Sequence, residues 1–118
     1  MTISYELARE LRVAAFSQVP TTHGGVGYYI TESGRLLTTI DFIGEGMSKE
    51  PFAYVPTLSE LIEACGEDFI ELEKVKDVWW SKGAWEKCGE GECPKYDVMG
   101  STPDEAVAKL WLEINKTA

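Results

Sequence analysis

The residues that could carry chemistry are three cysteines and a single histidine. Cys88 and Cys93 are separated by four residues, two of them glycines, and this spacing could place two thiolates on one metal ion. Cys65 and His23 would have to complete a tetrahedral site. Cys65, however, falls on the apolar face of a predicted helix, where a free cysteine behaves as a small hydrophobic side chain. We therefore expect free thiols, with no bound metal and no other cofactor.

Nucleophilic catalysis by a cysteine would need His23 as its base, because the chain has no other histidine. No sequence context favours that pairing, and the acidic neighbours of Cys88 and Cys93 disfavour the thiolate form. The odd number of cysteines argues against a disulfide framework and fits a reducing cytoplasm. We assign no catalytic residue, and a small cysteine- or metal-dependent enzyme or metal protein stays as an alternative.

Two carboxylates share one side of a predicted strand. Glu71 and Glu73 alternate with Ile70 and Leu72, so both point away from the core. With other nearby acids they could form a magnesium or hydrolytic site, but a solvated strand face explains them equally well. We place Glu71 and Glu73 on an acidic binding surface.

The aromatic residues give the strongest indication of a binding surface. Trp79, Trp80 and Trp85 lie within seven residues. Adjacent strand residues face opposite sides of a sheet, so Trp79 and Trp80 must point in opposite directions. One of them is expected to pack against helices and the other to lie on the outer face. Exposed tryptophans are typical interface anchors, although burial on both sides or self-association would also account for them.

Length and charge narrow the possible functions. At 118 residues and 44% hydrophobic, the chain fits one domain with a real core. A net charge of −9 argues against direct nucleic-acid binding, which needs lysines and arginines to neutralise phosphates. The N-terminus has no apolar signal region, and no apolar run approaches the length of a membrane span. We expect a cytoplasmic location and no membrane contact.

The hydrophobic patterns predict a single α+β domain over residues 1–118, in which about three helices pack against an antiparallel sheet of about four to six strands. The predicted order is roughly α-ββ-(β)-α-βββ-α. Two of the helices begin with capping boxes, at Thr57 with Glu60 and at Thr102 with Glu105. The predicted helices cover 3–16, 57–65 and 103–115, the predicted strands cover 28–31, 35–43, 52–55, 69–75, 78–82 and 95–99, and 83–94 is predicted to be a polar connection.

Several of these segments together resemble a group of small bacterial proteins associated with phages and prophages. The resemblance rests on residues 7–18, on residues 54–66, on a strand that contains tryptophan and on residues 100–116, about half of the chain. It implies a bacterial or phage setting and transfers no activity. The strand followed by Gly100, Thr102 and Glu105 is also similar to the end of HicB-type antitoxins, although the leading helix does not fit that family.

These observations favour a phage- or prophage-type accessory protein that is not an enzyme and that binds a host or phage protein as an adaptor or inhibitor. Its acidic surface and the open sheet face would form the interface, with Trp79, Trp80, Trp85, Glu71 and Glu73 as binding residues. Imitation of nucleic acid on a basic target is one form of this hypothesis. A nucleic-acid-associated regulatory or replication module is a further alternative, and a homo-oligomer is also open.

Overall fold

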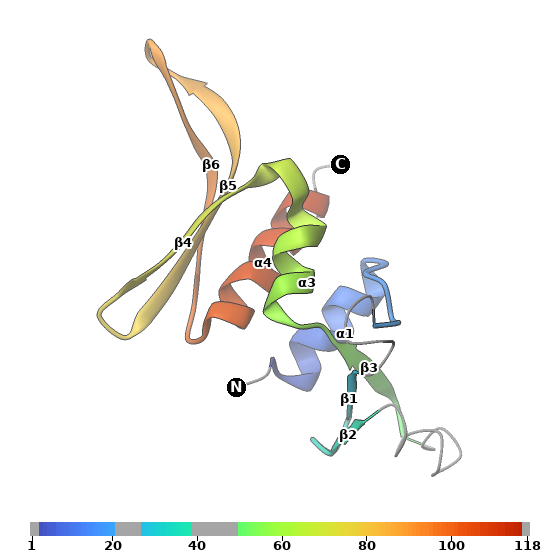
Figure 1. The fold of residues 1–118 in the computed structure, drawn as a ribbon. Helices are drawn as coiled ribbons and strands as arrows, with labels where there is room; N and C mark the ends of the chain where they lie inside the picture. The colour runs from blue at the N-terminus through green and yellow to red at the C-terminus, as the bar shows by residue number, and fades with distance from the viewer. Residues whose placement is uncertain (1–2, 21–26, 39–49, 117–118) are drawn as a thin grey trace. The chain divides into compact units, whose positions relative to one another are not determined.

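The computed structural model describes residues 3–20, 27–38 and 50–116. The chain divides into two compact units, Thr2–Glu60 and Leu61–Ala118. Each unit contains a three-stranded antiparallel sheet and at least one helix (Figure 1). The α+β class is therefore confirmed. The strands of the described residues form two separate sheets of three, where the sequence patterns suggested one sheet of four to six.

The N-terminal unit begins with helix α1 (Tyr5–Val13). The Ser4 side chain caps this helix by accepting a hydrogen bond from the Leu7 amide at 3.2 Å. Strands β1 (Tyr28–Thr31), β2 (Leu36–Thr38) and β3 (Phe52–Val55) form a sheet with the order β2-β1-β3. The predicted hairpin at 28–43 is thus confirmed as far as Thr38, and its remainder lies outside the described residues.

The core of this unit combines the apolar face of α1 with one face of its sheet. Tyr29, Leu37 and Tyr54 form a buried cluster, and Phe52 packs against it. The Tyr29 ring meets the Tyr54 ring at a centroid distance of 5.5 Å. The other fully or nearly buried apolar residues described in this unit are Ile3, Tyr5, Leu7, Ala8, Leu11, Phe16, Ile30, Ala53, Val55 and Pro56.

Helix α3 (Leu58–Cys65) lies at the division between the two units and begins with the predicted capping box. The Thr57 hydroxyl accepts from the Glu60 amide at 3.2 Å, and Glu60 accepts from the Thr57 amide at 2.9 Å. Glu60 is itself buried, and the same carboxylate oxygen accepts a hydrogen bond from the Tyr54 hydroxyl at 2.7 Å. Glu60 therefore joins the start of α3 to the core of the N-terminal unit.

The C-terminal unit continues through the 3-10 helix η2 (Gly66–Asp68) into strands β4 (Phe69–Val75), β5 (Val78–Cys88) and β6 (Gly91–Gly100). The strand order is β4-β5-β6, with each strand antiparallel to its neighbour. Residues 83–94 were predicted to be a polar connection, and that prediction is wrong. They form the outer half of the β5–β6 hairpin, because backbone pairing extends a strand into polar sequence whose side chains remain in water.

Helix α4 (Pro103–Lys116) packs against one face of this second sheet (Figure 1). Two glycines allow the close approach. A Cβ atom on Gly83 would lie 2.8 Å from the Leu110 side chain, and one on Gly100 would lie 2.5 Å from the Ala106 backbone nitrogen. The buried side of the helix consists of Ala106, Val107, Ala108, Leu110 and Trp111.

The start of α4 is fixed by a network around Glu105. Its amide donates to the Thr102 hydroxyl at 3.1 Å, as predicted. Its carboxylate was expected to reach the Thr102 amide but instead accepts from the Ser101 amide at 3.0 Å and from the Ser101 hydroxyl at 2.6 Å. It also pairs with Lys109 at 2.9 Å. These partners lower the pKa of Glu105 to about 2, with the Ser101 hydroxyl as the largest cause.

Candidate binding face

The face of the β4–β5–β6 sheet opposite α4 carries a row of apolar side chains. Trp80 pairs with Met99, and Val75 pairs with Val78 in the backbone register. Directly paired residues of an antiparallel sheet share a face, and side chains alternate along each strand, so these four lie on one side. Ser81 and Gly83 belong to the opposite side, which is buried against α4. We call Val75, Val78, Trp80 and Met99 the apolar row.

The apolar row is accessible. Met99 keeps 53% of its surface exposed and Val75 keeps 45%, while Val78 and Trp80 are half-buried. Aliphatic, thioether and indole groups in adjacent positions form a continuous apolar surface, unlike the isolated apolar side chains common on any protein. Val75, Val78 and Met99 were absent from the predicted site, because their neighbourhood depends on the strand register.

Carboxylates border the apolar row. Glu73 pairs with Trp80, and Glu71 pairs with Lys82, so both acids share the face of the row as predicted. Asp97, opposite Lys82 on β6, also lies on this face. The Lys82 ammonium contacts Glu71 at 3.3 Å, and this carboxylate raises the pKa of Lys82. Lys95, which alternates with Asp97 and Met99 along β6, is a second cation on this face. Glu71, Glu73 and Asp97 together therefore leave the border with a small excess of negative charge.

The other two tryptophans lie in different surroundings. Trp79 pairs with Gly100 and therefore faces the side of the sheet that carries α4, where Lys74 lies 5.9 Å from its ring centroid. The expectation that Trp79 and Trp80 point in opposite directions is confirmed. Trp85 pairs with Pro94 farther along the hairpin and is 55% exposed. The structure therefore brings Trp80, Glu71 and Glu73 together but leaves Trp79 and Trp85 outside this group.

A groove follows strand β6 beside the apolar row. Its volume is about 470 Å³. Tyr96 and Val98 point to the α4 side of the sheet, and Glu113 belongs to α4. The groove therefore runs along the edge strand β6 and meets the apolar row at Trp80 and Met99. The groove is lined by Trp80, Lys95, Tyr96, Asp97, Val98, Met99 and Glu113.

A second groove, of about 520 Å³, lies in the N-terminal unit beside α1. Two arginines line it, and the Arg12 guanidinium donates to the Phe52 carbonyl at 2.7 Å. The carboxylates of Glu6 and Glu32 share the same groove, so the charges around it balance. This mixed lining does not give the positive potential that an anion site needs.

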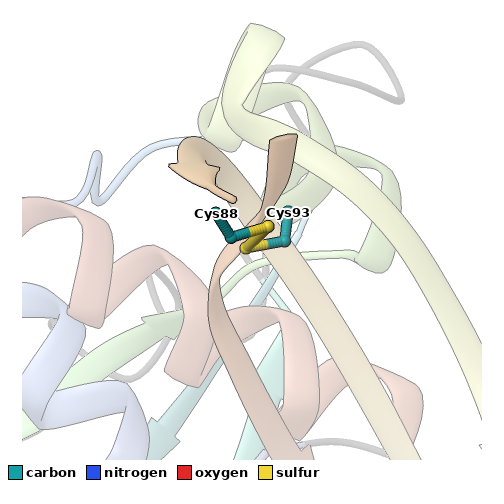
Figure 2. Close-up of a disulfide and its surroundings, with 2 residues drawn as sticks. All are labelled: Cys88 and Cys93. Carbon is teal, nitrogen blue, oxygen red and sulfur yellow. A yellow bond between two sulfur atoms is a disulfide. The ribbon is translucent and has the colours of Figure 1, made fainter. Parts of the chain in front are cut away.

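The cysteines differ from the expectation of free thiols. Cys88 and Cys93 form a disulfide across the β5–β6 hairpin, and Figure 2 shows the bond between the two strands. In this form neither sulfur is a thiolate, so the pair cannot supply the two metal ligands considered from the spacing. Cys65 is free and buried, as predicted, and burial raises the pKa of its thiol to about 12.

The remaining sequence-based expectations concern His23, metal binding and membrane-spanning helices. His23 lies outside the described residues. Among the residues that are described, no group of three or more His, Cys, Asp or Glu side chains is placed to hold a metal ion. Over the same residues, no helix is long and apolar enough to cross a membrane.

Comparisons with protein-family models, with curated proteins and with solved structures find no match to this chain. The candidate site therefore rests on the geometry of the β4–β5–β6 sheet.

Proposed function

We propose that this chain is a protein-binding accessory module, an adaptor or inhibitor without catalytic activity, and that it contacts its partner through the apolar row. The observation that carries the proposal is the pairing of Trp80 with Met99 on the sheet face opposite α4. Interfaces obtain most of their binding energy from a few apolar and aromatic side chains that lose water on contact. A tryptophan beside an exposed methionine on a regular sheet is such an anchor.

The border of the row indicates the chemistry of the partner. Glu73 and Asp97 leave the apolar row with a rim that is negative overall. Lys82 is paired with Glu71, and Lys95 offsets one of the two remaining carboxylates. A partner surface with an apolar centre and lysines or arginines around it would complement both parts of this face. A second copy of the chain is less suitable, because it would bring another acidic rim and another net charge of −9.

The proposed setting is cytoplasmic, and the proposed partner is a host or phage protein. The support for that setting is the resemblance of residues 7–18, 54–66 and 100–116 to small proteins associated with phages and prophages. The acidic rim and the net charge also favour a basic protein over nucleic acid as the direct partner, because nucleic acid carries the same sign of charge.

The experiment is affinity capture from a native bacterial lysate, with and without nuclease, using the wild-type chain and two variants. Met99→Lys places a charge in the apolar row directly opposite Trp80, at an exposed strand position. Val13→Lys is the matched control, because Val13 is also exposed but is the last residue of α1, which belongs to the N-terminal unit. We expect the wild type and Val13→Lys to capture the same host or phage protein, both with and without nuclease. Met99→Lys should not capture this protein.

Two results would contradict the proposal. Equal capture by Met99→Lys would show that the apolar row is not the interface. Loss of every captured protein on nuclease treatment would show that nucleic acid mediates the association, and the nucleic-acid-associated alternative would then replace the proposal.

A further inference from the structure

The end of the β5–β6 hairpin brings two cysteines together. Cys88 is the last residue of β5 and pairs with Gly91, while Cys93 pairs with Glu86. The Cα atoms of Cys88 and Cys93 lie 6.0 Å apart, within the ordinary range for bridged cysteines. The intervening turn contains Gly89 with a φ of +64°, a conformation that glycine adopts without strain. The backbone therefore places the two sulfur atoms within bonding reach in the folded chain (Figure 2).

This disulfide lies away from the buried core. The hairpin residues around it, 85–92, are all exposed, and backbone pairing from Trp85 with Pro94 to Cys88 with Gly91 holds the two strands independently of the bridge. The bridge spans a sequence separation of only 5. The constraint that a disulfide places on the unfolded chain grows with the length of the loop it closes. Opening this bridge should therefore leave the fold intact.

We propose that Cys88 and Cys93 are a reversible thiol–disulfide site whose co-reactants are low-molecular-weight thiols and disulfides such as glutathione. In the closing direction, the exposed Cys88 thiolate attacks one sulfur of glutathione disulfide and releases one glutathione thiolate. The Cys93 thiolate then attacks the Cys88 sulfur of that mixed disulfide and releases the second glutathione. The two protein thiols lose two electrons and two protons, and the small disulfide is reduced to two thiols.

The third cysteine takes no part in this chemistry. Cys65 is 5% exposed and is the free cysteine of the structure. Burial, with a smaller contribution from the charge of Asp68, raises the pKa of its thiol, so little thiolate is present at neutral pH. Cys65 is therefore an internal control for any reagent that attacks accessible thiolates.

Formation of the Cys88–Cys93 disulfide constrains the part of the hairpin that carries Trp85. Trp85 precedes Cys88 by three residues and pairs with Pro94, which directly follows Cys93. In the reduced form only the strand pairing holds this end of the hairpin, whereas in the oxidised form a covalent bond joins its two strands as well. Amide hydrogens near the tip should therefore exchange faster after reduction, and those of α4 should not change.

The test is a titration of the folded, full-length chain in glutathione buffers of stepwise increasing oxidising power. At each step, free thiols are trapped with N-ethylmaleimide under native conditions, and the intact mass and the modified peptides are determined. We expect the population to pass from two adducts, on Cys88 and Cys93, to none, with Cys65 unmodified throughout. The Cys93→Ser variant should instead accumulate a glutathione mixed disulfide on Cys88, because the second exchange step has been removed.

Several results would contradict the proposed thiol–disulfide couple. If Cys88 and Cys93 titrate independently, or if the wild-type chain accumulates stable glutathione adducts, the two residues do not form a couple. Loss of the circular dichroism of the folded chain on reduction would show that the disulfide is a structural requirement. An unchanged rate of amide exchange at residues 85–94 would remove the proposed effect on the hairpin.

Discussion

Trp80 on β5 and Met99 on β6 lie directly opposite each other, on the sheet face that points away from α4. The other face of the same sheet is filled by the helix, with Gly83 and Gly100 allowing its close approach. The sheet therefore buries one face within its own unit and leaves an indole and a thioether together on the other. This arrangement is the basis of the proposed protein-binding role.

The acidic rim should influence binding through long-range electrostatics. Glu73→Lys reverses a charge beside Trp80, so we expect slower association with a basic partner and weaker binding at low salt. The difference from the wild type should shrink as salt screens the charges. Association rates measured by surface plasmon resonance across a salt series test this expectation. Glu10→Lys, which makes the same change at an exposed position on α1, is the control. An equal effect of the two variants would assign the result to net charge alone.

Gly100→Ala should destabilise the C-terminal unit. The new Cβ atom would lie 2.5 Å from the Ala106 backbone nitrogen, so strand β6 and α4 would have to separate. We expect the free energy of unfolding to fall by about 1–3 kcal/mol, the usual cost of overpacking. Urea denaturation provides the measurement. Gly91→Ala at the other end of β6 is the matched control, since its Cβ atom would meet no atom within 4 Å. If the free energy of unfolding falls equally in Gly100→Ala and Gly91→Ala, the close contact between β6 and α4 is not the cause of the loss.

Tyr54→Phe should also lower the free energy of unfolding, through a polar contact. The Tyr54 hydroxyl donates to the buried Glu60 carboxylate at 2.7 Å, and its loss removes one of the donors that compensate for burial of that charge. We expect a cost of about 1.5–3 kcal/mol, typical of a hydrogen bond to a charged group. Tyr28→Phe, at an exposed position on β1, should change stability by much less. If thermal and urea unfolding show no loss for Tyr54→Phe, this hydrogen bond does not stabilise the fold.

The sequence predicted most of the elements because their signals are local. Capping by Thr57 and Thr102, the apolar faces of the helices and the alternation around Trp79 and Trp80 depend on nearby residues. The outer half of the β5–β6 hairpin was missed because strand pairing, which is not local, determines it. The same reason explains why Met99 was missed, since only the β5–β6 register places it beside Trp80. The Cys88–Cys93 bridge was missed for another reason: the spacing indicated that the two sulfurs could meet, but the odd number of cysteines favoured free thiols.

Glu105 should make stability depend on pH in a defined window. Its pKa is lowered from 4.5 to about 2 in the folded chain, chiefly by the Ser101 hydroxyl and Lys109. A lowered pKa stabilises the fold above pH 4.5, and this contribution disappears as the pH falls from 4.5 toward 2.

Glu105→Gln should therefore flatten the pH dependence of the free energy of unfolding in that window. At pH 7 the variant should lower the free energy of unfolding by about 1 kcal/mol. The loss is small because the carboxylate is partly exposed to water and because a side chain that caps a helix usually contributes about this much to stability. Urea denaturation at a series of pH values provides the test. Glu113→Gln is the control, since Glu113 contacts an exposed lysine at a longer distance of 3.6 Å. A slope identical to that of the wild type would exclude Glu105 as the source.

The most direct test of the binding role is hydroxyl-radical footprinting of the chain alone and in its captured complex. Met99, Val75 and Val13 are all exposed in the chain alone, so each provides a baseline of modification. Binding through the apolar row predicts that Met99 and Val75 become protected in the complex while Val13 is modified at an unchanged rate. Equal modification of Met99 and Val75 in the free and bound chains would contradict the proposed interface.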